Sequence, residues 1–388
     1  MPPRPIYLDC HATTPMDRRV LDAMLPYFTE HFGNPSSITH IYGWEAEAAV
    51  KKARTILADA IHCTPEEIVF TSGATEANNL AIKGIAEAYF SQGRHIITVQ
   101  TEHRAVLDPC YYLEGLGFEV TFLPVQQDGL IDLEQLEAAM RPDTILVSVM
   151  AANNEIGVLQ PLREIGELCH HHQILFHTDA AQAIGKIPLD VQQMKIDVMS
   201  LTAHKVYGPK GIGALYVRRR HPRVRLAAQM QGGGQERAMR AGTLYTPQIV
   251  GFAKAVELGL AELESESQRQ LQLREGLWQQ LSQLDGIYLN GHPTQRLPGN
   301  LNISVSGVDG AALLLGLQSV AALSSGSACS STSTAPSHVL MALGHSESLA
   351  YASLRFGMGR FNTESEIDQI AQAASATIQS LRQAVITV

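Results

Sequence analysis

The stretches His177-Thr178-Asp179-Ala180-Ala181-Gln182 and Ser200-Leu201-Thr202-Ala203-His204-Lys205 decide the fold of this chain. An apolar run, Ile174 to Phe176, precedes the first stretch, and both stretches end in polar residues. This pattern predicts two short buried strands that deliver polar side chains at their carboxyl ends, where ligands bind in an open α/β sheet. The sequence therefore predicts an α/β protein with a binding site at this edge of its sheet.

An acid and a lysine stand at these two strand ends, Asp179 in the first and Lys205 in the second. Enzymes that use pyridoxal phosphate need this pair. The lysine forms a Schiff base, and the carboxylate keeps the pyridine nitrogen protonated so that the ring accepts electrons. An ordinary surface ion pair is the alternative. The addition of Gln182, three residues after Asp179, favours the cofactor site.

Strand and helix signals alternate over the first part of the chain. Short apolar runs bounded by turn residues predict strands at residues 67–70, 95–99, 119–123, 144–150 and 213–217, the last of which is expected to close the sheet. Helical spacing between these runs predicts helices on both faces. The result is a doubly wound, mostly parallel α/β domain.

A smaller α+β domain is predicted to follow the sheet domain. Residues 17–32 and 249–284 are each predicted as one helix, and the second should leave the sheet domain. We therefore expect a large domain over residues 16–258 and a small domain made of residues 1–15 and 259–388.

The composition is that of an ordinary globular protein: 388 residues with a net charge of −9 and a pI of about 5.9. An acidic chain disfavours general binding to nucleic acid or to an anionic membrane. The basic run at 218–225 lacks the interleaved aromatic residues of a nucleic-acid site and is predicted as a solvated loop. No segment has the pattern of a signal peptide or of a transmembrane helix.

The cysteines and histidines give no metal-site pattern. Five cysteines without a paired Cys-x-x-Cys spacing indicate a reducing cytoplasm rather than a disulfide framework or structural zinc. The run His170-His171-His172 places its side chains on different sides of a predicted helix, so they cannot converge on one ion. We therefore predict a cytoplasmic protein without a metal site of its own.

Two further segments could contact a cofactor. The segment Thr71-Ser72-Gly73-Ala74-Thr75-Glu76 is a small-residue turn between a strand and a helix, which leaves backbone N–H groups free for a phosphate. A tight turn uses the same residues without a ligand, so both interpretations stay open. The segment Thr101-Glu102-His103 ends another strand. Its histidine is either a hydrogen-bonded surface residue or one placed for stacking and acid–base work.

Two residues of the predicted small domain stand out. Cys329 lies in a segment of small, polar, uncharged residues that should be mobile and accessible, as a reactive thiol requires. The other four cysteines lack such surroundings. Arg355 is a single charge between apolar residues, and such an arginine is usually paired. A substrate carboxylate, bound bidentately, is a plausible partner.

Together these motifs resemble those of the NifS/IscS-like cysteine desulfurases, which are pyridoxal phosphate enzymes of fold type I in the class V aminotransferase family. The resemblance runs from Tyr7 to about Leu381, and the segment after Cys329 is similar to the subgroup with a long cysteine loop. The motifs that carry it are Thr71-Ser72-Gly73-Ala74-Thr75-Glu76, Thr101-Glu102-His103, Asn153-Asn154-Glu155-Ile156-Gly157, His177-Thr178-Asp179, His204-Lys205, Arg240-Ala241-Gly242-Thr243 and Ser324-Ser325-Gly326-Ser327-Ala328-Cys329.

The resemblance implies a role for each matching residue. Lys205 would hold pyridoxal phosphate, Asp179 would pair with its ring nitrogen, and His103 would stack on the ring and assist catalysis. Further cofactor contacts would come from Ala74, Thr75, Asn154, Gln182, Thr202, Ala203 and His204, with Thr243 reaching in from a second subunit. The substrate carboxylate would be bound by Arg355, Asn34 and Asn154.

The resemblance also implies an activity and partners. L-Cysteine would become L-alanine while its sulfur passes to Cys329 as a persulfide, and then to acceptor proteins such as an iron–sulfur scaffold. The protein would be a homodimer, with Cys329 at most a transient ligand of a cluster held by a partner. A selenocysteine lyase or aminotransferase of the same fold would keep Lys205 but would not depend on Cys329. A non-catalytic docking protein would need neither residue.

Overall fold

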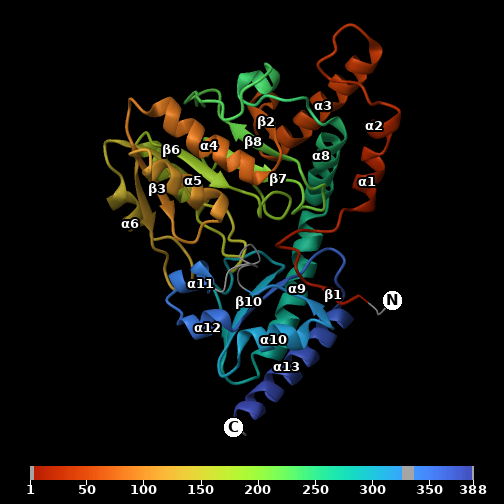
Figure 1. Cartoon of the computed structure of the whole chain (residues 1–388), viewed down its shortest axis with the longest axis vertical. Coiled ribbons are helices and arrows are strands. Elements are labelled where there is room, and N and C mark those ends of the chain that lie inside the picture. The colour runs from red at the N-terminus through yellow and green to blue at the C-terminus, as the bar shows by residue number, and fades with distance from the viewer. Residues whose placement is uncertain (1–3, 326–335, 387–388) are drawn as a thin grey trace.

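A seven-stranded sheet forms the upper half of the molecule in the computed structural model, which describes residues 4–325 and 336–386 (Figure 1). Its strands, in spatial order, are β2 (Ile68–Thr71), β8 (Gly213–Val217), β7 (Val198–Thr202), β6 (Leu175–Asp179), β5 (Thr144–Ser148), β3 (His95–Val99) and β4 (Glu119–Leu123). The strands from β7 to β4 pair in parallel. The predicted doubly wound, mostly parallel sheet is therefore confirmed.

Strand β8 departs from the expected topology. It was expected to close the sheet, but it lies between β2 and β7 and runs antiparallel to both. The reason is the short connection from Thr202 to Gly213, since a short connection joins antiparallel neighbours, whereas a parallel crossover needs a longer one. Strand β2 is the edge strand instead.

Helices cover both faces of this sheet, as an α/β fold requires. One face packs against α4 (Ala74–Tyr89) and α5 (Arg104–Glu114). The opposite face packs against α1 (Arg18–Met24), α3 (Ile41–Ala60), α6 (Leu133–Ala139), α7 (Leu162–His171) and α8 (Thr246–Ala261). Each strand from β5 to β8 is buried along its whole length, because both of its faces are covered.

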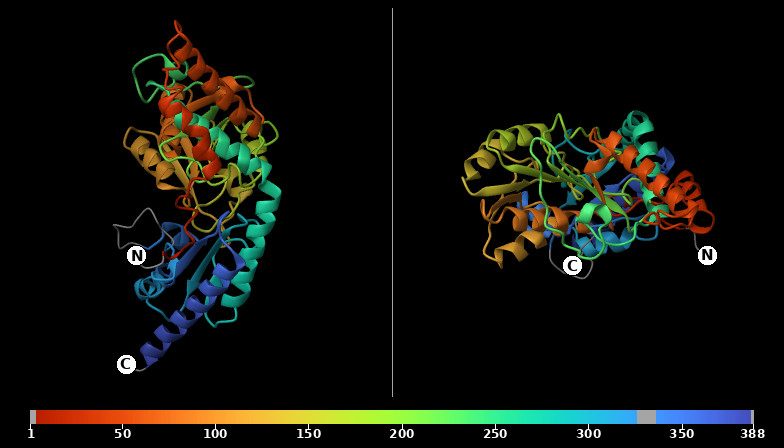
Figure 2. Two further views of the ribbon diagram at one scale, coloured as in Figure 1. Left: turned by 90° about the vertical axis from the view of Figure 1, so that its right-hand side faces the viewer. Right: turned by 90° about the horizontal axis from the view of Figure 1, so that it is seen from above.

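A second hydrophobic core lies in the lower half of the molecule (Figures 1 and 2). Its antiparallel sheet contains β9 (Ile287–Leu289), β10 (Asn300–Val305) and β12 (Ser353–Gly357). The helices of this half are α9 (Leu263–Leu281), α10 (Gly310–Leu317), α11 (His338–Ala342), α12 (Glu347–Tyr351) and α13 (Glu364–Ile386). The N-terminal strand β1 (Ile6–Tyr7) pairs with β11 (Ala321–Ala322), and Leu8 belongs to the lower core. The predicted boundary between residues 258 and 259 stays a prediction.

Two predicted helices are interrupted in the structure. The region 17–32 contains two short helices, α1 and α2 (Pro26–Thr29), because Pro26 begins a new helix and cannot continue the first. The region 249–284 contains α8 and α9, which meet at Glu262. Figure 2 shows these two helices running one after the other from the upper half into the lower half.

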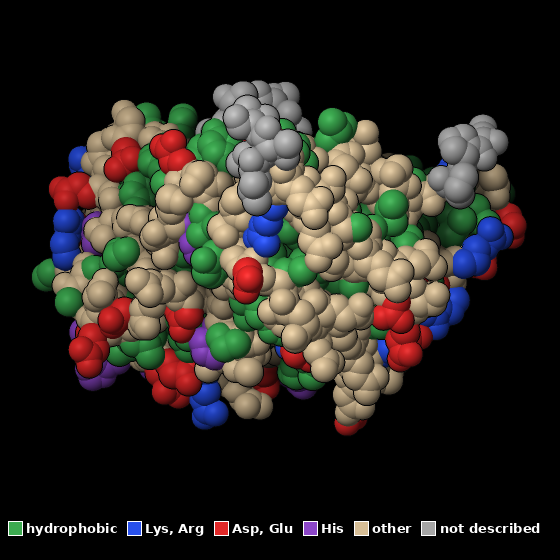
Figure 3. Space-filling view, turned by 90° about the horizontal axis from the view of Figure 1, so that it is seen from below, with side chains coloured by type: hydrophobic (Ala, Val, Ile, Leu, Met, Phe, Trp, Pro, Cys, Tyr) green, Lys and Arg blue, Asp and Glu red, His purple; other side chains and the backbone are tan. Residues whose placement is uncertain are grey.

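The surface corrects one further expectation. Arg218, the first residue of the basic run, is buried, forms an ion pair with Asp197 at 3.1 Å, and donates to two backbone carbonyls. Val224 is buried as well, and the other residues of that run are exposed. Seen from below, acidic and basic side chains are scattered over the surface (Figure 3). Within residues 4–325 and 336–386, no helix is both long and apolar enough to cross a membrane.

Candidate active site

A cavity of about 470 Å³ lies at the carboxyl ends of the parallel strands. It is also bordered by the amino end of α4 and by residues of the N-terminal arm, including Thr13. The predicted site residues that line it together are Ala74, Thr75, His103, Asn154, Asp179, Gln182, Thr202, His204 and Lys205. The structure therefore brings together in one cavity residues from five separate motifs.

The remaining predicted site residues lie elsewhere. Ala203 is buried beneath the cavity wall, and Asn34 and Thr243 are exposed away from this cavity. Arg355 is buried at the junction of the two halves. Cys329 lies outside the described residues. The roles predicted for these five residues stay predictions.

Asp179 is held by two hydrogen bonds at the end of β6. Its Oδ1 accepts from the backbone N–H of Ala181 at 2.9 Å, and its Oδ2 accepts from Nδ2 of Asn78 at 2.7 Å. A carboxylate has about four acceptor positions, so it can accept one more donor from the cavity. Asn78 is fully buried on α4, so one side chain ties the helix at the cavity to this carboxylate.

The amino end of α4 forms one wall of the cavity. Gly73 precedes the helix with φ of 148°, a conformation that glycine adopts readily, and among the described residues no side chain caps this end. The first N–H groups of a helix have no partner within the helix and attract an anion. Ala74 and Thr75 present these groups to the cavity. This wall suits a phosphate.

His103 caps α5 and lines the same cavity. Its Nδ1 accepts a hydrogen bond from the backbone N–H of Ala105 at 3.0 Å, so the neutral ring carries its proton on Nε2. Burial lowers the pKa of His103, and the positive charge of Lys205 lowers it further. The imidazole is therefore neutral in the ordinary range of pH and can accept a proton or donate one.

His204 and Lys205 follow β7 directly. The carbonyl of His204 accepts from both the N–H and the hydroxyl of Thr14, at 2.8 and 3.0 Å, which ties this turn to the N-terminal arm. Burial, and then the charges of Lys205 and Lys210, lower the pKa of His204 to about 4. The ring is neutral, and its Nδ1 lies 3.2 Å from the hydroxyl of Thr13.

Arg355 joins the two halves of the molecule beside the cavity. It is 1% exposed, its Nη2 forms an ion pair with Asp9 at 2.7 Å, and its Nη1 donates to the carbonyl of Asn154 at 3.0 Å. Its Nε has no hydrogen-bond acceptor among the described residues. The expected pairing of this arginine is confirmed, but the partner is a protein carboxylate.

These residues fit pyridoxal phosphate. The cavity offers N–H groups for a phosphate at Ala74 and Thr75, an amine at Lys205 for a covalent bond, and a carboxylate with spare acceptor capacity at Asp179. Among the described residues, no group of histidines, cysteines and carboxylates could hold a metal ion. The chemistry of this donor set is that of a cofactor with a phosphate and a basic ring nitrogen.

The described cysteines are poor candidates for a reactive thiol. Burial raises the pKa of Cys10 to about 12, and it also raises the pKa of Cys63, Cys110 and Cys169. A nucleophilic cysteine needs a lowered pKa and access to its target. These four thiols are protonated at neutral pH, which leaves Cys329 as the fifth cysteine of the chain.

Several residues of the site were not found from the sequence. Glu76 lines the cavity and forms an ion pair with Arg240 at 2.8 Å, while its Oε2 accepts from the N–H of Ser72. Asn78 lies one helical turn after Ala74, and this spacing was a usable signal for it. Asp9 and Lys186 gave no such signal.

Comparisons with known proteins agree with this geometry. The sequence profile of the family described as "Aminotransferase class-V" matches residues 6–370. The chain is 56% identical to "Cysteine desulfurase" of Mus musculus over 381 residues, which cover 98% of this chain and 83% of the mouse protein. It is 55% identical to "Cysteine desulfurase IscS" of Neisseria meningitidis over 379 residues, which cover 98% and 93% of the two chains. A solved "NifS-like protein" matches with a TM-score of 0.90 at 36% identity, over 97% of this chain and 100% of that chain.

Proposed function

The chain belongs to the cysteine desulfurases of the aminotransferase class-V family, and on this premise we propose that Lys205 and Cys329 divide the reaction between them. Lys205 holds pyridoxal phosphate and moves the proton of the substrate. Cys329 receives the sulfur of L-cysteine, and L-alanine leaves. The sulfur then passes to an acceptor protein, such as an iron–sulfur scaffold.

One observation carries the proposal. Asp179 and Lys205 stand at the ends of the neighbouring parallel strands β6 and β7, in a cavity that also contains the free amino end of α4. When bound, the cofactor supplies an electron sink for charge that develops at the Cα atom of the substrate. Asp179 keeps a proton on the ring nitrogen, and Ala74, Thr75, Thr202 and His204 hold the phosphate. Gln182 and Asn154 orient the ring through its oxygen.

Two side chains move protons. The amine of Lys205 would remove the proton from the Cα atom of the substrate, because it is a basic group of the cavity that would hold the cofactor. His103 lines the same cavity, and its ring, which is neutral because burial and the charge of Lys205 lower its pKa, can take up a proton and return it during the reaction. Arg355 would fix the substrate through its carboxylate.

The sulfur transfer balances without a further reactant. The thiolate of Cys329 attacks the sulfur atom of the substrate, and a sulfur–sulfur bond forms while the Cβ–S bond breaks. The Cβ atom keeps the electron pair of that bond and takes up a proton, which gives alanine. Cys329 is left as a persulfide, whose outer sulfur atom is available to an acceptor.

The experiment that tests the proposal measures three products together. The purified chain with pyridoxal phosphate and L-cysteine is expected to form alanine and, with a reductant, an equal amount of sulfide. Without reductant, mass spectrometry of the peptide that contains Cys329 should show the added mass of one sulfur atom. Alanine formation without sulfur on this peptide would contradict the proposed acceptor.

Replacement of Arg355 by lysine is expected to raise KM for L-cysteine about 30-fold, since a charge-assisted contact is worth about 2 kcal/mol. A lysine keeps the positive charge but cannot contact Asp9, Asn154 and a substrate carboxylate at the same time. Steady-state kinetics would show this change with kcat reduced much less.

Arg274 supplies the matched control for Arg355. It is also a buried arginine of the lower half, but its ion pair is with Glu275 on its own helix. Arg274→Lys is expected to leave KM unchanged. An unchanged KM in Arg355→Lys as well would remove Arg355 from the substrate site.

His103→Gln is expected to lower kcat about 100-fold, as the loss of a general acid or base does. Because the pKa of His103 is lowered by burial and by the charge of Lys205, the wild type should stay active below the ordinary histidine pKa. Its rate should fall only as the pH drops through that lowered value and the ring becomes charged. The pH dependence of kcat would show this decline, which the variant should lack.

An exposed histidine provides the comparison for His103. His171 lies at the end of α7 on the surface, and His171→Gln should keep both the rate and its pH dependence. A decline of kcat at low pH that is identical in wild type and His103→Gln would assign the titration to another group.

A homodimer is supported by exposed apolar side chains on and around α1, α2 and α3, helices of the upper half of the molecule (Figure 1). Large exposed apolar patches mark interfaces. Here the rings of Phe28 and Tyr245, and of Phe32 and Tyr42, are neighbours. The exposed apolar side chains of this surface are Leu25, Phe28, Phe32, Ile38, Ile41, Tyr42, Trp44 and Tyr245. Thr243 is exposed beside Tyr245, so this surface would carry it to the cavity of a second copy. Sedimentation as a monomer would contradict this arrangement.

We propose that the protein is located in the cytoplasm. A persulfide and the described free cysteines Cys10, Cys63, Cys110 and Cys169 require reducing surroundings, which supports the cytoplasm. Relatives of this chain also include a protein named as a mitochondrial cysteine desulfurase. Fractionation of cells that express the chain would test the cytoplasmic location.

A further inference from the structure

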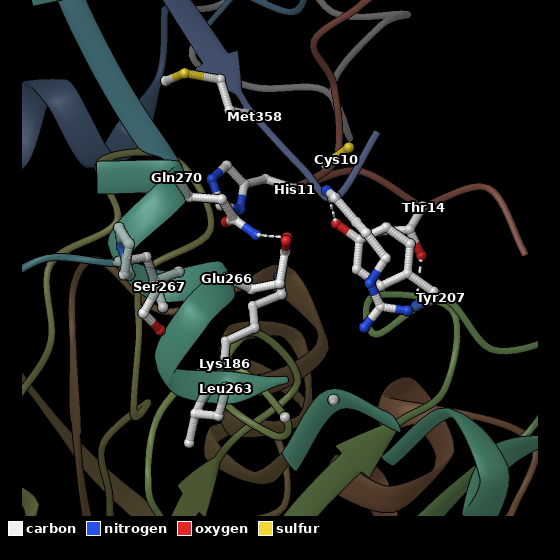
Figure 4. A pocket seen from close by; sticks show the side chains of 16 residues that line it. Cys10, His11, Thr14, Lys186, Tyr207, Leu263, Glu266, Ser267, Gln270 and Met358 are labelled. Atoms are coloured by element: carbon white, nitrogen blue, oxygen red, sulfur yellow. Dashed lines mark hydrogen bonds between the residues drawn. The ribbon is translucent and has the colours of Figure 1, made fainter. Parts of the chain in front are cut away.

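A second, small cavity of about 30 Å³ is lined by Lys186, whose amine contacts Gln182 of the proposed cofactor site (Figure 4). Its lining comes from the N-terminal arm, the turns after β6 and β7, helices α8 and α9, and the segments before β10 and after β12. Among its lining residues are Cys10, His11, Lys186, Glu266 and Arg360. The functional proposal above assigns no role to Lys186.

Lys186 reaches the cofactor site through Gln182. Its Nζ donates to Oε1 of Gln182 at 3.0 Å, and the same oxygen lies 3.3 Å from Nδ1 of His11. The other end of the amide is also engaged, since Nε2 of Gln182 donates to the carbonyl of His11 at 2.8 Å. Gln182 is 2% exposed, so its amide is bound by protein groups rather than by bulk solvent.

The hydrogen-bond capacity of Gln182 shows what remains for a ligand. A carboxamide has two acceptor positions on oxygen and two hydrogens on nitrogen. Lys186 and His11 occupy the oxygen, and the carbonyl of His11 takes one hydrogen. Of the four hydrogen-bonding positions of the Gln182 amide, one N–H therefore remains for a ligand, and Gln182 lines the large cavity.

The direction of the amide is set by partners that cannot exchange roles. An ammonium group only donates and a backbone carbonyl only accepts, whereas the imidazole of His11 can do either. Without Lys186, and with the other tautomer of His11, the carbonyl of His11 alone among these partners would oppose a turned amide, whose oxygen would then approach the oxygen of a ligand. Lys186 therefore opposes the orientation that would repel the cofactor ring oxygen.

We propose that Lys186 is a positioning residue of the cofactor site, which holds Gln182 so that its remaining N–H points to the ring oxygen of pyridoxal phosphate. This inference rests on the proposed function, because it gives Gln182 the contact assigned there. Lys186 touches neither substrate nor cofactor in this role and acts through Gln182 alone.

The charges around Lys186 are consistent with this role. Burial, and then the positive charge of Lys205, lower the pKa of Lys186 to about 7, while Cys10 acts in the opposite direction. Burial lowers the pKa of His11 far below its usual value, so this ring is neutral. Glu266, Tyr207 and Arg360 are the other titratable or charged groups that line the small cavity. Both the ammonium and the amine form of Lys186 can donate to Gln182.

A double-mutant cycle tests the inference on the full-length chain. Pyridoxal phosphate is titrated into cofactor-free wild type, Lys186→Met, Gln182→Ala and the double variant, and its affinity and visible absorption band are measured. Lys186→Met is expected to weaken binding about 10-fold and to shift the band, since a hydrogen bond that involves a charged group is worth about 1.5–3 kcal/mol. In the Gln182→Ala background, the same change should alter affinity less than about 2-fold, because the coupled partner is absent.

Lys186→Arg is the conservative control, since it keeps a donor and is expected to restore most of the affinity and the band of the wild type. Equal losses in the arginine and methionine variants would overturn the inference, as would effects that add in the double variant. Lys186→Met removes a polar group without leaving a buried charge, so circular dichroism should show a folded protein. An unfolded Lys186→Met would also count against a role confined to Gln182.

Failure of the proposed function is distinguishable from failure of this inference. If the wild type forms no band, or forms one that survives Lys205→Ala, the proposed cofactor site itself is wrong. If the wild type forms a band that depends on Lys205 and Lys186→Met behaves like the wild type, only the role of Lys186 is wrong.

Discussion

Lys205→Ala is expected to lower alanine formation from L-cysteine by about 1000-fold or more, as the loss of a residue that acts as both covalent anchor and base does. Lys205 lines the proposed cofactor site and follows β7 directly, so no neighbouring amine occupies the same position on the strand. Lys210 also lines the cavity, but it lies on the far side of the turn that leads to β8.

Two measurements separate the functions of this lysine. The alanine variant should lose the visible band of covalently bound cofactor while still binding pyridoxal phosphate, because Asp179 and the amino end of α4 remain. Gel filtration of the loaded variant should then remove the cofactor, which the wild type retains. Lys51→Ala is the control, since Lys51 is exposed and pairs only with Glu47 on the same helix. Alanine formation near the wild-type rate in Lys205→Ala would reject the proposed mechanism.

The site at the carboxyl ends of the strands was predictable, because the end of a buried strand can be recognised in the sequence. An apolar run that stops at Asp179, or at the residues before Lys205, identifies both a buried strand and the polar group at its carboxyl end. In a parallel sheet these ends lie on one side, so His103 and Asn154 could also be assigned to the same site. The structure confirms that all four line one cavity.

Contacts between distant segments were not predictable in the same way. Asp9 and Arg355 lie at opposite ends of the chain, and nothing in either local pattern indicates that they form an ion pair. Asn78 lies one helical turn after Ala74 and Lys186 has the spacing of an ordinary turn residue, but neither spacing indicates which side chain is contacted. Their importance depends on the tertiary contacts with Asp179 and Gln182. Local periodicity predicts strands and helices, but it does not report which side chains meet when these elements pack.

It was also hard to predict from the sequence whether the apolar side of a helix packs against the core of its own chain. An apolar side of a surface helix normally faces the core, yet Leu25 and Phe28 are exposed on the upper part of the molecule. The periodic pattern is the same for a face that packs against the chain's own core and for one that packs against a second copy. The proposed dimer interface explains why these two side chains are apolar and exposed.

Cys329→Ala is expected to lower sulfide and alanine release by about 1000-fold or more, while the bound cofactor keeps its visible band, because loss of a nucleophile leaves binding intact. Burial raises the pKa of each of the four described cysteines, so none of them can replace the missing thiolate. A variant that keeps the visible band of the bound cofactor but loses turnover indicates a residue that acts after the cofactor has bound.

Cys63→Ala is the control for Cys329→Ala, since Cys63 is the one described cysteine that is only partly buried. It should keep the wild-type rate and the sulfur on Cys329, because its thiol is protonated and 3.5 Å from the carbonyl of Thr64. Equal activity in wild type and Cys329→Ala would contradict transfer to this residue. Lys205 would still be required in that case, and the chemistry would be that of an aminotransferase or a selenocysteine lyase on the same fold. Dependence on both Lys205 and Cys329 is therefore the result that only a persulfide-forming desulfurase explains.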